Sequence, residues 1–115
     1  MQVSISLHEQ FKRDLKQLRK KYKSVTKDYA QLLADLQENP LLGTDLGGGV
    51  RKVRMAIAAK GKGKSGGARV ITYKWNQVAP DVYKISLLTI YDKSEMSNVS
   101  DSYIKHLLAT LPDKG

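Results

Sequence analysis

The stretch from Arg51 to Lys74 reads RKVRMAIAAKGKGKSGGARVITYK. Apolar, β-branched runs stand near its two ends, by alternation in Val53-Met55-Ile57 and continuously in Val70-Ile71-Thr72-Tyr73, and a turn of lysine and glycine separates them. This pattern predicts two strands joined by a flexible connection. The stretch contains no Asp or Glu, and its cations are Arg51, Lys52, Arg54, Lys60, Lys62, Lys64, Arg69 and Lys74. Such a cationic ribbon favours a polyanionic partner, of which a phosphate backbone is the commonest.

The whole chain is basic as well. It has 115 residues, a formal net charge of +9 and a sequence pI near 9.8. Self-repulsion of that size opposes compaction, so the charge favours binding of a partner over the alternative that it only keeps the protein in solution. The length and a hydrophobic content of 41% predict one globular domain over residues 1–115, built around a modest core.

Several classes of protein are excluded by what the composition lacks. The absence of cysteine excludes disulfide scaffolds, thiolate zinc sites and thiol nucleophiles. The two histidines, His8 and His106, belong to two different predicted helices and have no cluster of acids around them, so we expect neither a metal site nor a cofactor. No signal peptide and no apolar run of about 18 residues is visible, which predicts a soluble, cytoplasmic protein.

The N-terminal third predicts a strand followed by a helical hairpin. Apolar residues alternate over residues 3–7 and then recur at helical spacing from His8 to Tyr22. A second helix begins with Ser24 or Thr26 as its N-cap and ends at Asn39-Pro40, because proline disfavours helical geometry in the residue before it. These two helices, joined by a few residues, are expected to cover one face of a sheet.

The rest of the chain predicts a mostly antiparallel, twisted sheet and a last helix. Residues 43–49, with three consecutive glycines, are interpreted as a loop before the two strands of the cationic stretch. Residues 76–81 predict a hairpin connection, and residues 82–91 form the longest predicted strand. The last helix has Ser100 as its cap, Pro112 as its end, and an apolar stripe of Ile104, Leu107, Leu108 and Leu111. The predicted order is β-α-α-β-β-β-α, an α+β fold.

Within the cationic stretch, strand parity places Lys52 and Arg54 on one face, opposite the apolar residues of the same strand. That strand therefore has an apolar face to bury and a cationic face to present to phosphate. Parity does not decide the environment of Arg69, for which a buried ion pair and a groove-facing phosphate ligand are both open. Gly63-Lys64-Ser65 is not a P-loop, because position 58 is alanine and the serine leads into a strand. The lysines and glycines of this turn can still bind phosphate.

Tyrosine is the commonest aromatic residue, with six against a single phenylalanine. On strands and helix stripes its default role is packing. A tyrosine beside cations has a second interpretation, because its ring can stack on a base and its hydroxyl can transfer a proton. Tyr91, at the end of the long strand and close to Lys93, is the best placed for that chemistry.

Three runs resemble the RelE/ParE superfamily of toxins from type II toxin–antitoxin systems, and within it the HigB-like, RelE-type members. They are Leu46–Met55 (LGGGVRKVRM), Lys60–Tyr73 (KGKGKSGGARVITY) and Leu87–Met96 (LLTIYDKSEM). The resemblance covers nearly the whole chain and includes the element order. Its most specific part is the lysine–glycine turn followed by Gly-Gly-x-Arg.

The resemblance implies an endoribonuclease of the mRNA interferase kind, which enters the ribosomal A site and cleaves mRNA there, so that translation stops. It implies chemistry without a metal, in which the ribose 2′-hydroxyl attacks the adjacent phosphate and leaves a cyclic phosphate while cations stabilise the developing charge. The partners that it implies are a cognate antitoxin, acidic at least where it covers residues 51–74, together with the ribosome and mRNA.

The resemblance also implies roles for single residues. Those matched to catalytic positions are Lys52, Arg54, Arg69 and Lys93. The tyrosine that the family carries shortly after the position of Glu95 is missing, and Val99 falls near that place. The proton transfer then belongs to Tyr91, which we place with the catalytic set, or to the more distant Tyr103, or the acid–base assignment is different. The residues assigned to RNA binding are Lys60, Lys62, Lys64 and Tyr73.

Two other functions are open for the same fold. One is ParE-like inhibition of DNA gyrase, and the other is RNA binding without catalysis. The cationic strand face favours cleavage over gyrase binding, because an inhibitor of a protein does not need phosphate ligands. It does not separate cleavage from simple RNA binding.

Overall fold

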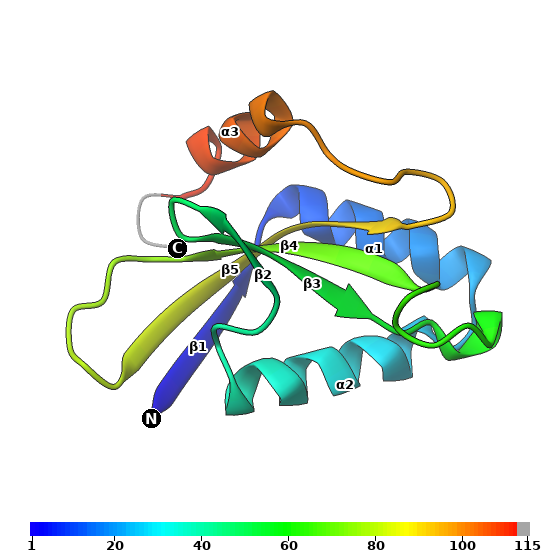
Figure 1. Cartoon of the computed structure of the whole chain (residues 1–115), viewed down its shortest axis with the longest axis horizontal. Coiled ribbons are helices and arrows are strands. Elements are labelled where there is room, and N and C mark those ends of the chain that lie inside the picture. The colour runs from blue at the N-terminus through cyan, green and yellow to red at the C-terminus, as the bar shows by residue number, and fades with distance from the viewer. Residues whose placement is uncertain (113–115) are drawn as a thin grey trace.

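Five strands form one sheet in the order β1-β5-β4-β3-β2 in the computed structural model, which describes residues 1–112 (Figure 1). β1 (Gln2–Leu7) and β5 (Val82–Asp92) are parallel, and the other neighbouring pairs are antiparallel. The remaining strands are β2 (Thr44–Gly47), β3 (Val50–Met55) and β4 (Ala68–Lys74). A mostly antiparallel sheet in an α+β fold is therefore confirmed.

The helical hairpin consists of α1 (Glu9–Lys21) and α2 (Val25–Glu38), and it covers one face of the sheet (Figure 1). The helices bury Phe11, Leu32 and Leu36 against alternate residues of the strands, which point to this face of the sheet, such as Val53 and Val70. Burial of these apolar side chains is the main force that holds the two layers together. Asn39 is the C-cap of α2, so the stop predicted from Asn39-Pro40 is confirmed.

The opposite face of the sheet carries a smaller apolar cluster under α3 (Asp101–Ala109). α3 packs on Val50, Ile71 and Leu88, and the Ser100 hydroxyl accepts a hydrogen bond from the backbone N–H of Tyr103 at 3.1 Å, as expected of an N-cap. The helix is short and leaves Arg54, which lies farther along β3, exposed. This uncovered end of the face carries several of the cations that the sequence analysis singled out.

One strand was not predicted. β2 lies inside residues 43–49, which the sequence analysis assigned to a loop, and it forms a hairpin with β3. The turn between them needs backbone angles that only glycine adopts at little cost, and Gly47, Gly48 and Gly49 have φ of +89°, +61° and +85°. The three glycines thus make a tight turn between two strands.

Two boundaries also differ from the prediction. α3 ends at Ala109, before Pro112, because the Thr110 hydroxyl donates to the carbonyls of His106 and Leu107 at 3.0 and 3.1 Å and closes the last turn. Ile57 is buried but lies beyond the end of β3, where the chain enters a 3₁₀ turn, η1 (Ala58–Lys60).

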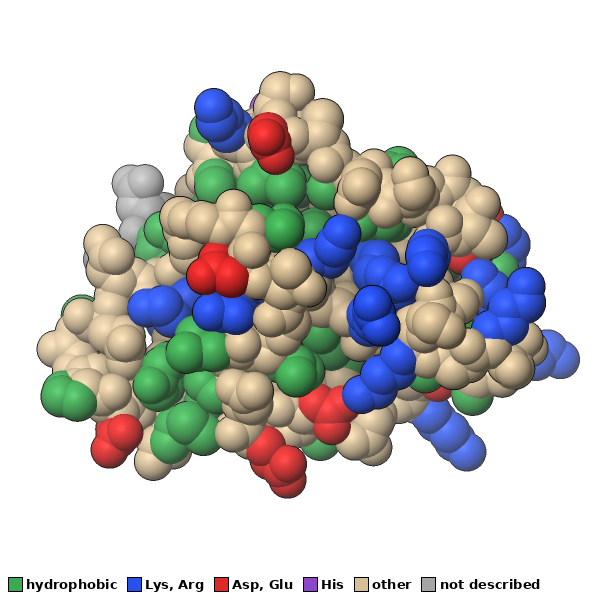
Figure 2. Space-filling view, viewed as in Figure 1, with side chains coloured by type: hydrophobic (Ala, Val, Ile, Leu, Met, Phe, Trp, Pro, Cys, Tyr) green, Lys and Arg blue, Asp and Glu red, His purple; other side chains and the backbone are tan. Residues whose placement is uncertain are grey.

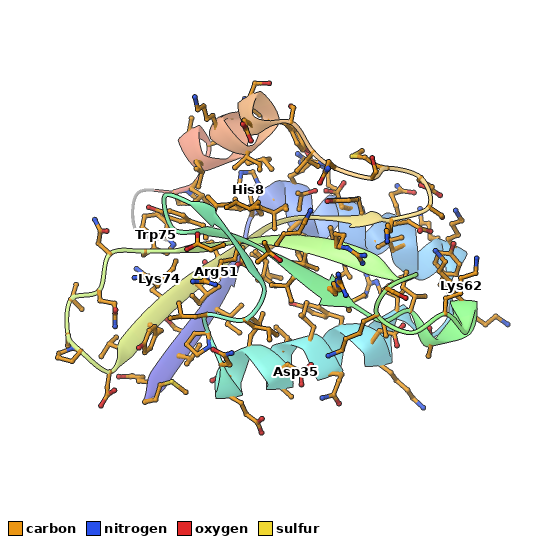
Figure 3. All side chains as sticks on the ribbon, viewed as in Figure 1. His8, Asp35, Arg51, Lys62, Lys74 and Trp75 are labelled. Carbon is orange, nitrogen blue, oxygen red and sulfur yellow. The ribbon has the colours of Figure 1, made fainter. Side chains whose placement is uncertain are left out.

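His8 is the N-cap of α1 rather than part of the helix. Its Nδ1 accepts from the N–H of Gln10 at 2.9 Å, and its Nε2 lies 2.8 Å from the Thr110 hydroxyl and 3.1 Å from the Leu107 carbonyl. The side chain thus joins the start of α1 to the end of α3 (Figure 3). His8 therefore has a capping and packing role.

Candidate active site

A row of three side chains crosses the sheet at its uncovered end. Arg54 of β3 pairs with Arg69 of β4, and Arg69 pairs with Tyr91 of β5. Lys52 lies two residues before Arg54 on β3 and therefore on the same face. Figure 2 shows Lys and Arg side chains gathered over β3 and the adjoining turn, between α3 and α2. The cations predicted to share a face thus lie together.

Arg69 is buried, with only 5% of its surface exposed, and it is held by backbone carbonyls. Nη1 donates to the carbonyls of Lys64 and Ala68 at 3.0 and 3.1 Å, and Nη2 donates to the Ser65 carbonyl at 3.1 Å. Within residues 1–112 no carboxylate forms an ion pair with it. Burial and the repulsion of Arg54 both lower the pKa of Arg69. The first of the two interpretations, a buried ion pair, is therefore wrong.

Lys52 is half-buried and borders two hollows in the surface. Its Nζ donates to Oδ1 of Asn98 at 3.0 Å. One hollow, of about 230 Å³, is lined by Lys52, Arg54 and Lys64 together with residues 42–44. The other, of about 300 Å³, extends from Lys52 to Tyr91, Asn98 and the start of α3. The first hollow has the charge to hold a phosphate, and the second has mixed polar and apolar walls.

Tyr91 is 7% exposed, and its hydroxyl is a buried side-chain polar atom without a hydrogen-bond partner within the described chain. Burial raises the pKa of this tyrosine, although the nearby charge of Arg69 opposes the shift. An unpaired buried hydroxyl costs roughly 1–3 kcal/mol, and in native proteins such groups are rare. Its presence next to Arg69 makes the row a candidate functional site.

The structure places Lys60 differently from its predicted role in RNA binding. Its Nζ donates to Oδ1 of Asp92 at 2.7 Å, and its side chain is 9% exposed. Asp92 in turn accepts from the Tyr22 hydroxyl at 2.7 Å and from the N–H and hydroxyl of Ser94 at 2.9 and 2.8 Å. Because the charge of Lys60 is already paired in the interior, we remove it from the RNA-binding set.

Tyr73 also lies away from the row. It pairs with Val50 near the other end of β4 and makes an edge-to-face contact with Trp75, with ring centroids 5.3 Å apart. Figure 3 shows Trp75 and Lys62 at opposite ends of the molecule. Tyr73 packs under α3 and is far from the turn, so we remove it from the RNA-binding set too.

The other predicted cations surround the row. Lys62 and Lys64 are exposed on the turn between η1 and β4, and Lys93 is exposed directly after β5. The N–H of Lys93 donates to the Gly67 carbonyl at 3.1 Å, which ties the end of the turn to the end of β5. Of the three, Lys64 lines the hollow beside Arg54 and can therefore contact a ligand bound there.

Sequence reasoning missed Asp92 and Asn98, which hold Lys60 and Lys52. The one available signal for Asp92 was its position at the end of an otherwise apolar strand, where an acid facing inward needs a partner. Asn98 gave no signal, because it lies in an irregular segment whose path only the fold determines.

The site offers cations and hydroxyls rather than metal ligands. Across residues 1–112 no group of three or more His, Asp or Glu side chains is placed to hold a metal ion. In the same residues no helix is long and apolar enough to cross a membrane. Lys52, Arg54 and Arg69 can stabilise an anion electrostatically, and Tyr91 lies beside them.

A comparison with protein families agrees with this fold. The family model of the RelE toxin of the RelE/RelB toxin–antitoxin system matches residues 9–110, which is most of the chain and includes the whole cationic stretch. Members of that family pair with an antitoxin. The chain belongs to the RelE family of toxins of toxin–antitoxin systems.

Proposed function

We propose that this toxin is a ribosome-dependent mRNA endoribonuclease that cleaves mRNA in the ribosomal A site and so inhibits translation. The observation that supports it best is the pair Arg54 and Arg69. Like charges directly opposite each other destabilise a sheet, and a buried guanidinium without a carboxylate is costly. A phosphate bound between the two side chains offsets both costs.

The proposed reaction needs no metal. The 2′-oxygen bonds to phosphorus as its proton leaves, the P–O5′ bond breaks, and the 5′-oxygen takes up a proton, so that a cyclic phosphate and a 5′-hydroxyl result. Arg54 and Arg69 stabilise the charge that develops on the phosphoryl oxygens, and Lys52, which lines a hollow together with Arg54, adds a third positive charge. Lys62, Lys64 and Lys93 bind the neighbouring backbone.

We assign proton donation to Tyr91. A phenol is protonated at neutral pH and can give its proton to the far more basic leaving 5′-oxygen, and burial, which raises the pKa of Tyr91, keeps that proton in place until the oxygen leaves. The hydroxyl is covered in the free protein, and bound RNA must therefore displace a neighbouring side chain to reach it. The antitoxin, in this proposal, carries an acidic segment that covers residues 51–74 and competes with RNA for the same cations.

The decisive experiment maps the 5′ ends of cellular mRNA by primer extension after the toxin is induced. Lys52→Ala is the test variant, because Lys52 is half-buried and makes a single side-chain hydrogen bond, to Asn98. Lys12→Ala, which removes an exposed cation of α1, is the matched control. We expect new ends within translated codons for the wild type and the control, and few or none for Lys52→Ala.

Two outcomes contradict the proposal. If growth arrest occurs without new mRNA ends but with DNA breaks, the toxin acts on gyrase. If the purified protein degrades naked RNA as fast as mRNA on ribosomes, the ribosome dependence is wrong.

A further inference from the structure

The carboxylate of Asp92 is the centre of a buried polar cluster that the proposed chemistry does not use. Its side chain is completely buried, and it accepts hydrogen bonds from Lys60, Tyr22 and Ser94 at 2.7 to 2.9 Å. Lys21 lies 3.9 Å away, at the edge of the cluster. Each donor comes from a different part of the chain: the α1–α2 connection, η1, and the segment after β5.

This cluster fixes the lysine–glycine turn, residues 60–67, at both ends. Lys60, the first residue of the turn, is held by Asp92 directly. Gly67, the last, pairs through its carbonyl with the N–H of Lys93, the residue after Asp92. Four of the residues between Lys60 and Ala68 are glycines, so without these attachments the turn has many accessible conformations.

The lysine–glycine turn also holds the guanidinium of Arg69 in place. Two of the three hydrogen bonds of the Arg69 guanidinium go to turn carbonyls, those of Lys64 and Ser65. Movement of the turn therefore moves or releases the guanidinium that faces Arg54. Asp92 also pairs across the strands with Ala68, the residue before Arg69, so the acid and the guanidinium sit on adjacent rows of the sheet.

A role in stability alone explains this cluster poorly. A buried ion pair contributes little net stability compared with apolar side chains of the same volume, because desolvation offsets the attraction. It does give a directional attachment, and here that attachment is made where a flexible, charged turn meets the sheet. The arrangement suits precise positioning, on which a reaction rate depends steeply.

We propose that Asp92 is a positioning residue for RNA cleavage, which through Lys60 and the ends of the turn holds Arg69 in its place opposite Arg54. The proposal rests on the proposed function. It also means that Lys60 acts by anchoring the turn and makes no contact with RNA.

The test is a double-mutant cycle of Asp92→Asn and Lys60→Met, with cleavage of mRNA on programmed ribosomes as the first readout. Each single variant is expected to lower kcat about 10- to 100-fold, because a displaced guanidinium stabilises the transition state less, and to change KM less than about 3-fold. The double variant is expected to be no slower than the slower single one, since both changes break the same attachment. Asp81→Asn, the same change at an exposed position directly before β5, is the control and keeps the wild-type rate.

Two results separate positioning from RNA contact or from a loss of folding. The proposal is overturned if Lys60→Met raises KM and lowers the salt dependence of RNA binding. It is also overturned if the losses of kcat in the two single variants multiply in the double variant. Because Asp92→Asn leaves Lys60 unpaired in the interior, Tyr22→Phe is the milder variant, which removes one donor to Asp92 and keeps the ion pair. It should lower kcat with no more than a small change in thermal midpoint, and an unchanged kcat counts against the proposal.

A second readout does not depend on cleavage. The backbone amides of Lys93 and Ser94 donate inside this cluster, so their hydrogen exchange should be slow in the wild type and about 10-fold faster or more in Asp92→Asn and Lys60→Met. Equal exchange in all variants shows that the turn is not held by Asp92 and overturns the proposal. If the wild type cleaves no RNA yet these amides respond as expected, the proposed function fails while the attachment of the turn stands.

Discussion

Arg54 and Arg69 lie directly opposite each other on β3 and β4, and among residues 1–112 neither forms an ion pair. The substitution Arg54→Gln therefore separates the effect of this charge on folding from its effect on RNA binding. Glutamine keeps most of the length of the side chain and removes its charge. We expect the variant to be more stable than the wild type and much less toxic. A stabilising change that abolishes activity is typical of a site whose charges serve a ligand.

The magnitude follows from the position of the pair. Opposed like charges on neighbouring strands cost roughly 0.2–1 kcal/mol, and we take about 0.5 kcal/mol because Arg54 is exposed and solvent screens the repulsion. For a chain of 115 residues this corresponds to a rise in the thermal midpoint of about 2 °C. Loss of one charge stabiliser from the site lowers the cleavage rate by roughly 10²- to 10³-fold.

The assay is thermal unfolding of purified protein at low and high salt, together with growth arrest after induction. Arg13→Gln, on the exposed surface of α1, is the control, because it lowers the net charge of +9 by the same amount without touching Arg69. At low salt, the thermal midpoint should rise more for Arg54→Gln than for the control. This rise should become smaller near 1 M salt, where the Debye length is about 3 Å. A midpoint below that of the control, or a gain that salt leaves unchanged, refutes the reasoning.

Three further predictions concern the same end of the sheet. Tyr91→Phe removes a buried hydroxyl that has no hydrogen-bond partner within residues 1–112, so the free energy of unfolding should stay the same or rise by about 1 kcal/mol. The cleavage rate should fall roughly 10²-fold or more, and a variant that still cleaves RNA rules Tyr91 out as the proton donor. Gly67→Ala places a Cβ 2.2 Å from the Met55 carbonyl oxygen and should cost about 3 kcal/mol, whereas Gly63→Ala, with open space around it and a φ of +62°, should cost about 1 kcal/mol in the same denaturation assay. Burial opposes ionisation of Asp92, but hydrogen bonds from its neighbours outweigh burial and hold the pKa of Asp92 well below the ordinary 3.8. The ionised carboxylate therefore contributes its full stability above about pH 4, and this contribution is lost as the pH falls further. Asp92→Asn should flatten the acid side of a curve of stability against pH, and a slope identical to that of the wild type contradicts this assignment.

Most of the fold could be predicted from the sequence because its signals are local. The apolar stripes of α1 and α2, the stop at Asn39-Pro40 and the cap at Ser100 depend on residues within a few positions of one another. β2 could not be found in this way. Its residues Thr44–Gly47 are all exposed and carry no apolar alternation, so only pairing with β3 defines the strand.

The site could be predicted only in part, for a similar reason. Strand parity correctly put Lys52 and Arg54 on one face, because parity is a property of the strand itself. The environment of Arg69 depends on the positions of the backbone carbonyls of residues 64 and 65, and strand parity does not predict these positions. Tyr73 has the parity of Arg69 but lies at the far end of the strand, under α3.

The sequence does not show which cations of residues 51–74 are paired with acids, because their partners lie far along the chain, whereas the fold does. Lys60 is paired with Asp92, 32 positions away, and Arg51 lies 3.7 Å from Asp45. Within residues 1–112 the other six cations of the stretch form no ion pair: Lys52, Arg54, Lys62, Lys64, Arg69 and Lys74. Lys74 lies at the far end of β4, whereas the other five come from β3, the connecting turn and the start of β4, where Arg54 and Arg69 pair. Cations that gather at one end of a sheet without carboxylates raise the free energy of the fold, and a bound phosphate backbone is the ligand that best lowers it again.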